Sequence, residues 1–179
     1  MVYLIDASAL VLSLLKRPVA ELVGARGRIL RLITSSPKDD QRVLYVPNFC
    51  MAESSRAFSR VFVKVNGDGE GEYRRHVEAL LDLVSSKRRN VVKTYELRRE
   101  HLVDVEDVFL ADQRLPRRDN EKPLSGLDGL VIAMGRTLMK VHPRVCVVTA
   151  EKRMARVCQS DPEAFPPAVC IIRDDIPGL

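Results

Sequence analysis

The sequence predicts an α/β fold, a three-layer α/β/α sandwich with a central, mainly parallel sheet. Short apolar runs rich in valine and isoleucine alternate with longer segments of helical periodicity along the chain. Strands that alternate with helices pair in parallel, and right-handed crossovers place the helices on both faces of the sheet. The 179 residues show no internal repeat and no change of composition, so we expect one domain spanning residues 1–179.

The first quarter of the chain predicts two strands separated by two helices. Residues 2–6 form an apolar run, and residues 8–16 follow with a helical pattern that Ser8 would cap. A second helical pattern covers residues 19–33, and the next strand is expected over residues 42–46.

The middle of the chain predicts two more helices before the third strand. Asn48 would cap a helix over residues 49–65, and a glycine-containing loop is expected over residues 66–71. A helix over residues 72–86 and a strand over residues 90–95 follow.

The remaining chain repeats this alternation. Its predicted elements, in order, are a helix over 98–112, a charged loop over 113–123, a helix over 124–140, a strand over 144–149, a helix over 151–159 and a strand over 168–172. Each predicted strand is therefore followed or preceded by a helix long enough to cover the sheet.

The overall charge is mildly basic, with a formal net charge of +5 and a pI of about 9.2. That balance is compatible with a polyanionic partner and equally with an ordinary solvated surface. The chain has no tryptophan and only 5% aromatic residues. Recognition of a nucleic acid would therefore depend on contacts to phosphates more than on stacking of bases.

The four cysteines predict buried, reduced thiols, because each lies in an apolar run and no two form a CxxC pair. The apolar N-terminus has no preceding basic residue and is interrupted by Asp6, which argues against a signal peptide. No other stretch approaches the length of a membrane span. These features predict a soluble cytoplasmic protein without membrane association.

Four acids lie where a predicted strand gives way to a helix or early in the following helix: Asp6, Glu53, Asp128 and Glu151. If the sheet is parallel, its carboxyl edge brings these positions together. Clustered carboxylates oppose folding unless cations hold them, and Mg²⁺ or Mn²⁺ prefers such oxygen ligands. Ions of this kind support phosphoryl chemistry by activating water and neutralising phosphate charge. The three histidines are isolated, so a histidine-based zinc site is not expected.

Four segments of the sequence resemble the PIN domain, most closely that of VapC-type toxin ribonucleases: Leu4-Ile5-Asp6-Ala7-Ser8-Ala9-Leu10, the lone Glu53, Leu127-Asp128-Gly129-Leu130-Val131-Ile132-Ala133, and Val147-Val148-Thr149-Ala150-Glu151-Lys152-Arg153-Met154. The resemblance implies an α/β/α fold, a magnesium or manganese site and cleavage of RNA. It also implies that Asp6, Glu53 and Asp128 bind metal, that Glu151 holds the fourth acidic position, and that Ser8 and Thr149 assist. An antitoxin protein and a homodimer are the partners that the resemblance implies besides RNA.

The sequence departs from the family pattern at two places. The family usually has aspartate where this chain has Glu151, which is longer by one methylene, so its carboxylate must fold back or bind through water. The chain is also longer than a compact toxin. The additional length is expected as insertions near residues 66–73 and 113–123, which would shape substrate access or a partner surface.

Each candidate also has a simpler interpretation. Asp6 can be only a helix cap, and Glu53 can form an ion pair with Arg56 or Arg60 on the same helix. Asp128 and Glu151 can be first-turn acids favoured by the helix dipole. The cations nearest the four acids in sequence either contact phosphates of RNA or are solvated surface charges: Arg56, Arg60, Lys152 and Arg153.

The leading functional hypothesis is a magnesium- or manganese-dependent endoribonuclease. Such an activity is compatible with a role as the toxin of a toxin–antitoxin pair. The alternative is a catalytically weak PIN-like module that binds RNA or a protein, motivated by Glu151. A third hypothesis, a haloacid-dehalogenase-like phosphatase, requires a second aspartate two residues after Asp6, where this chain has Ser8.

Overall fold

The computed structural model describes residues 1–16, 18–36, 41–63, 69–84, 92–118 and 121–179. Its centre is a five-stranded sheet with the order β3-β2-β1-β4-β5, in which every pair of neighbours is parallel. The strands are β1 Val2–Ile5, β2 Val43–Pro47, β3 Val92–Tyr95, β4 Val145–Thr149 and β5 Ala168–Cys170. The predicted sheet and its parallel pairing are therefore confirmed.

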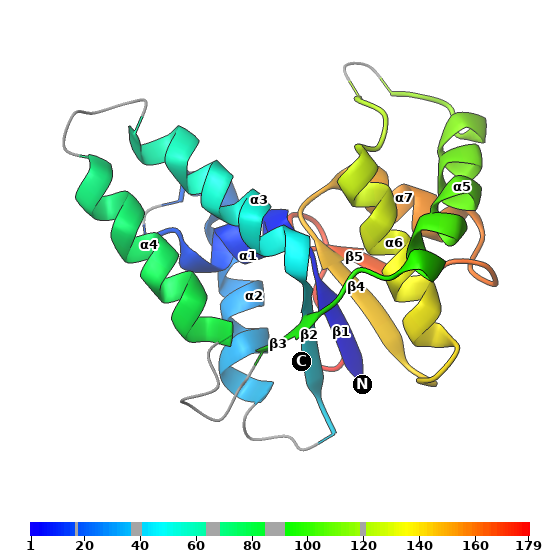
Figure 1. Ribbon diagram of the computed structural model, residues 1–179, viewed down its shortest axis with the longest axis horizontal. Helices are drawn as coiled ribbons and strands as arrows, with labels where there is room; N and C mark the ends of the chain where they lie inside the picture. The colour runs from blue at the N-terminus through cyan, green and yellow to red at the C-terminus, as the bar shows by residue number, and fades with distance from the viewer. Residues whose placement is uncertain (17, 37–40, 64–68, 85–91, 119–120) are drawn as a thin grey trace.

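Helices cover both faces of this sheet, as Figure 1 shows. One layer contains α1 Ala7–Leu14, α2 Val23–Ser35, α3 Asn48–Phe58 and α4 Gly69–Val84, with the short turns η1 Ala20–Leu22 and η3 Ser59–Val63. The other layer contains α5 Arg99–Arg114, α6 Gly126–Met139 and α7 Lys152–Ser160. The three-layer α/β/α prediction is confirmed.

The strand order places β1 and β4 side by side at the middle of the sheet. The chain first proceeds outward from β1 through β2 to β3, and then returns to β4 on the other side of β1. This reversal is the switch point at which open parallel sheets form a crevice for ligands beyond the carboxyl ends of the strands. Every residue of β1 and β4 is buried, as expected for central parallel strands covered on both faces.

Several predicted boundaries are shifted. The cap of α1 is Asp6, not Ser8, because the Asp6 side chain accepts the backbone N–H of Ser8. Helix α3 includes Asn48 instead of beginning after it. Helix α4 begins at Gly69, three residues before the predicted start, and a Cβ at this position would collide with the Phe62 carbonyl group, so only glycine fits there.

The two expected insertions, near residues 66–73 and 113–123, lie outside the described residues at positions 66–68 and 119–120. Residues 69–73 belong to the first turns of α4, and residues 113–114 end α5. Between α5 and α6, the described residues 115–118 and 121–125 form an irregular connection. Their status as insertions remains a prediction.

The described residues confirm the prediction for the cysteines, since all four are free and buried. Their burial within an apolar interior is consistent with thiols that pack and do not pair. Among the described residues, no helix combines the length and the apolar character needed to cross a membrane.

Candidate metal centre

Asp6 lies directly beyond β1, at the switch point of the sheet, and is only 2% exposed. Its Oδ2 atom accepts hydrogen bonds from the Ser8 backbone N–H at 3.2 Å, the Ser8 hydroxyl at 2.5 Å and the Thr149 hydroxyl at 3.0 Å. Within the described residues, no hydrogen bond engages Oδ1. Asp6 therefore does cap α1, as the simpler interpretation required, and its second oxygen can still serve a ligand.

Ser8 and Thr149 connect the ends of the two central strands through Asp6. The Ser8 hydroxyl also accepts the Ala150 backbone N–H at 2.9 Å, and the Thr149 hydroxyl accepts the Glu151 backbone N–H at 2.9 Å. The two hydroxyl oxygens are 3.3 Å apart. Both residues expected to assist the site thus orient the Asp6 carboxylate and the turn that follows β4.

Glu53 reaches the same place from α3. One potential ligand atom from each of Asp6, Cys50 and Glu53 lies within 4.8 Å of the other two. Burial, followed by the negative charges of Asp6 and Asp128, raises the pKa of Glu53 to about 7. No ion pair within the described residues joins Glu53 to Arg56 or Arg60, so the simpler interpretation of Glu53 is not supported.

Cys50 is the site residue that the sequence reasoning missed. Its apolar surroundings in the sequence predict only a buried thiol, although Cys50 lies three residues before Glu53 and hence on the same face of the helix. That spacing was the available signal. Burial and the neighbouring charges of Asp6 and Glu53 raise the pKa of Cys50, so its thiol stays protonated and adds no negative charge.

Asp128 combines a capping role with proximity to the other acids. Its Oδ2 accepts the Ser125 backbone N–H at 3.0 Å, while the Ser125 hydroxyl accepts the Asp128 backbone N–H at 3.1 Å. This reciprocal pair is a capping box at the start of α6. Burial raises the pKa values of Asp6 and Glu53, and the negative charge of Asp128 contributes to the rise in both.

Glu151 occupies the N-cap position of α7 but makes no side-chain cap hydrogen bond. Its side chain is exposed at the edge of the cluster. Partial loss of hydration, with the charges of Asp128 and Asp6, raises the pKa of Glu151. Within the described residues, Asp128 and Glu151 do not join the tight group formed by Asp6, Cys50 and Glu53. They lie farther out and interact with it electrostatically.

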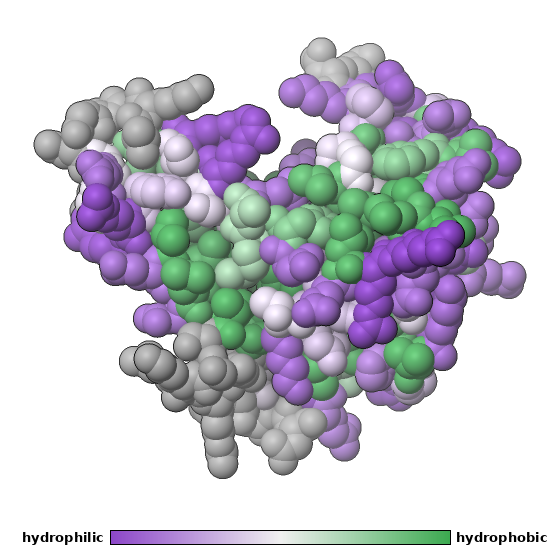
Figure 2. All heavy atoms as spheres, viewed as in Figure 1, coloured by the Kyte–Doolittle hydropathy of each residue, from purple (hydrophilic) through white to green (hydrophobic). Residues whose placement is uncertain are grey.

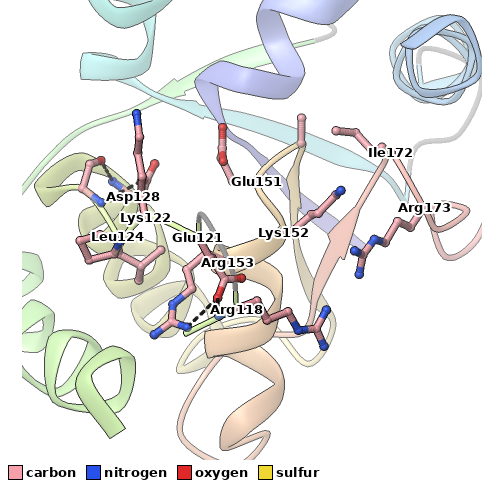
Figure 3. Close-up of a pocket in the computed structure, with 13 residues that line it drawn as sticks. Arg118, Glu121, Lys122, Leu124, Asp128, Glu151, Lys152, Arg153, Ile172 and Arg173 are labelled. Carbon is pink, nitrogen blue, oxygen red and sulfur yellow. Dashed lines mark hydrogen bonds and ion pairs between the residues drawn. The ribbon is translucent and has the colours of Figure 1, made fainter. Parts of the chain in front are cut away.

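Glu53, Asp128 and Glu151 line a cleft at the carboxyl ends of the strands, whereas the buried Asp6 is not among the residues that form its walls. Figure 2 shows the molecule hollowed at its upper edge between hydrophilic rims. The cleft has two cavities, of about 730 Å³ and about 580 Å³, that share Ala150, Glu151 and Ile172 in their walls. Asp128 lines the larger cavity and Glu53 the smaller. Figure 3 shows Asp128 and Glu151 approaching the larger cavity from α6 and from the turn after β4.

The four cations expected near the site have different surroundings. Arg56 and Arg60 line the smaller cavity, and Lys152 lines the larger. Arg153, in contrast, is only 5% exposed, and its five N–H donors bond to the carboxylates of Asp112 and Glu121 and to three backbone carbonyls. A guanidinium so engaged has no donor left for a substrate, so we exclude Arg153 from the proposed phosphate contacts.

Comparison with protein-family models finds no match, and comparison with curated proteins finds none either. Solved structures are similar over nearly the whole chain. One is VapBC2 from Rickettsia felis bound to a DNA fragment from its promoter, with a TM-score of 0.59 and 9% identity, covering 94% of this chain and 98% of that one. Another is VapBC-1 from nontypeable Haemophilus influenzae, with a TM-score of 0.56 and 11% identity, covering 97% and 100%.

These similarities concern the fold, because identities of 9% and 11% carry no argument about individual side chains. The strand order, the two helical layers and the position of Asp6 beyond the central strand are observed in the structure of this protein and do not depend on the comparisons. The chain has a VapC-like PIN-domain fold.

Proposed function

We propose that this protein is a magnesium- or manganese-dependent endoribonuclease that hydrolyses phosphodiester bonds of RNA. The observation that carries the proposal is the convergence of four carboxylates at one edge of the sheet. Burial and mutual repulsion raise the pKa values of three of them, Asp6, Glu53 and Glu151. A divalent cation would relieve this repulsion, and carboxylate oxygens are the ligands that Mg²⁺ and Mn²⁺ prefer.

The residues present fit such an ion. Asp6 and Glu53 would hold it directly, while Asp128 and Glu151 would bind outer ligands such as water. The bound ion supplies an activated water and neutralises charge on the phosphate. Ser8 and Thr149 keep Asp6 oriented for this task by fixing Oδ2.

The side chains that line the cleft support RNA as the substrate. The similar structures support an antitoxin protein as the partner. Arg56, Arg60 and Lys152 line the cleft and would contact RNA phosphates beside the cleaved bond. Because the similar structures are VapBC complexes, we also propose that this chain is the toxin of a toxin–antitoxin pair.

Loss of activity on removing the metal-binding charge tests the proposal. Asp6→Asn and Asp128→Asn should each lower Mn²⁺-dependent cleavage of RNA by on the order of a hundredfold or more, since the ion supplies several kcal/mol of transition-state stabilisation. Glu78→Gln, which removes an exposed acid on α4, is the matched control and should cleave normally. Full activity in both site variants would exclude this mechanism.

A second candidate function is a PIN-like module that binds RNA or a protein without cutting. The exposed position of Glu151, outside the group of closely placed ligand atoms, favours it. Calorimetric titration with MnCl₂ distinguishes the two functions. Binding that is lost in Asp6→Asn supports the nuclease, and absence of binding at millimolar concentration supports the module.

A further inference from the structure

Besides Arg153, whose donors are all engaged, four cationic side chains line the larger cavity of the cleft, and we call these four the cationic arm: Arg118, Lys122, Lys152 and Arg173. They come from three separate segments, namely the α5–α6 connection, the start of α7 and the turn after β5. Figure 3 shows them distributed around the cavity, with Lys122 near Asp128 and Lys152 between Glu151 and Arg173. All four are exposed, and no ion pair within the described residues includes any of them. Their charge is therefore available to a ligand.

The acids of this cavity do not cancel the cationic arm. Glu121 is already neutralised from inside the protein by Arg156 at 2.5 Å and Arg153 at 3.0 Å. These contacts, that of Arg156 above all, lower the pKa of Glu121 to about 2. The remaining acids, Asp128 and Glu151, lie at the end that leads to the candidate metal centre, with Lys122 and Lys152 beside them (Figure 3). Four cations thus face two acids that have no ion-pair partner among the described residues, so the wall keeps a net positive charge.

Hydrogen bonds from α7 hold the wall that bears two of these cations, Arg118 and Lys122. Arg153 donates to the carbonyl oxygens of Leu115 and Pro116, and Arg156 donates to Pro116 as well. The Arg118 backbone N–H donates to the Glu121 carboxylate at 3.2 Å. The connection that carries Arg118 and Lys122 is therefore attached to α7, which reduces the ordering that binding would otherwise require.

The smaller cavity differs in character. Its wall is mostly apolar, formed by Val11, Leu12 and Leu15 of the first helical segment with Leu22 and Ala57, and its two cations are Arg56 and Arg60. Since both cavities meet at Glu151, a ligand that crosses the cleft encounters a cationic half and a largely apolar half. Because of this asymmetry, we expect the two sides of the metal centre to contact chemically different parts of a bound ligand.

We infer that the cationic arm binds the sugar–phosphate backbone of a single RNA strand on one side of the cleaved bond. This inference rests on the proposed function and describes how the proposed ribonuclease would hold its RNA substrate. A strand carries one negative charge per phosphate, which the acids of the centre repel and the cationic arm neutralises. Contacts of this kind position the strand without reading its sequence.

Salt-dependent binding tests the inference. The affinity of a fluorescein-labelled single-stranded oligoribonucleotide of mixed sequence is measured by anisotropy in EDTA at several KCl concentrations, so that metal-dependent cleavage does not interfere. Lys122→Gln and Arg173→Gln should each reduce the slope of log affinity against log salt by about 0.7, the value per phosphate contact on a single strand. Each should weaken binding of different sequences by a similar factor.

Lys93→Gln is the matched control, because Lys93 is exposed on β3 at the opposite edge of the sheet. Its slope should equal that of the unaltered protein. Unchanged slopes in both cleft variants, or no binding by the unaltered protein at low salt, would overturn the inference. A parallel assay of RNA cleavage with MnCl₂ separates the two proposals: cleavage with unchanged slopes rejects the cationic arm alone, and reduced slopes without cleavage reject the nuclease alone.

Discussion

Asp6 shows how one side chain acquires both a structural and a candidate chemical role. Its Oδ2 atom caps α1 and accepts two hydroxyl hydrogen bonds, so its orientation is fixed by Ser8 and Thr149. One of its carboxylate oxygens lies within 4.8 Å of potential ligand atoms of Cys50 and Glu53. The cap and the ligand interpretations, which are alternatives in the sequence, are compatible in the fold because a carboxylate has two oxygens.

Glu53 carries a prediction about pH. Its raised pKa, about 7, means that the folded protein binds more protons than the unfolded chain between about pH 4.5 and pH 7. The metal-free protein should therefore lose stability as the pH rises through that window. Urea denaturation in EDTA at pH 5 and pH 8 measures the loss, which for Glu53 is on the order of 2 kcal/mol because partial exposure reduces the full effect.

The control for this prediction is Glu53→Gln, which has no proton to release. It should be more stable than the unaltered protein at pH 8 and should show a smaller loss between the two pH values. Asp6 and Glu151 also have raised pKa values and act in the same direction, so some dependence should remain. An identical dependence in both proteins would contradict the assignment to Glu53.

At the scale of elements, the position of α6 relative to α7 depends on the connection that precedes α6. Arg153 of α7 binds Asp112 of α5 with side-chain exposures of 5% and 6%, and Asp112 in turn accepts the Leu124 backbone N–H at 3.3 Å. Leu124 immediately precedes the capping box that orients Asp128. The buried pair therefore helps to place one candidate metal ligand, although neither member touches the cluster.

We expect Arg153→Met to destabilise the protein by about 3–5 kcal/mol, because it leaves the buried Asp112 carboxylate without its partner. Urea denaturation measures the effect. The double variant Arg153→Met with Asp112→Leu should recover much of the stability, since both charges are then absent. Additive losses in the double variant would show that the pair is not coupled.

At the scale of the whole molecule, the topology determines where chemistry is possible. The switch point between β1 and β4 leaves a crevice at the carboxyl ends of the strands, and the two helical layers supply its opposite walls. Glu53 approaches from the layer of α3 and Asp128 from that of α6. A ligand in this cleft therefore contacts both layers and should stabilise the fold as a unit.

A bound divalent cation should raise the melting temperature of the protein. At a hundredfold excess over Kd the stabilisation is about 2.7 kcal/mol, or roughly 5–10 °C for a chain of this length. Thermal unfolding with EDTA or with MnCl₂ measures it. Asp6→Asn should abolish the increase and Glu78→Gln should keep it; equal increases in all three proteins would indicate binding elsewhere.

The element order, the parallel sheet and the four candidate carboxylates can be predicted from the sequence, because apolar periodicity and strand–helix alternation are local properties of the chain. How these parts meet is visible only in the folded structure. The fold brought Cys50 beside Asp6 and left Glu151 outside the closest group. It also buried Arg153, which in sequence looks like an ordinary cation next to the site. Such outcomes depend on distances between residues far apart in the chain, which are fixed only when the two helical layers pack against the sheet.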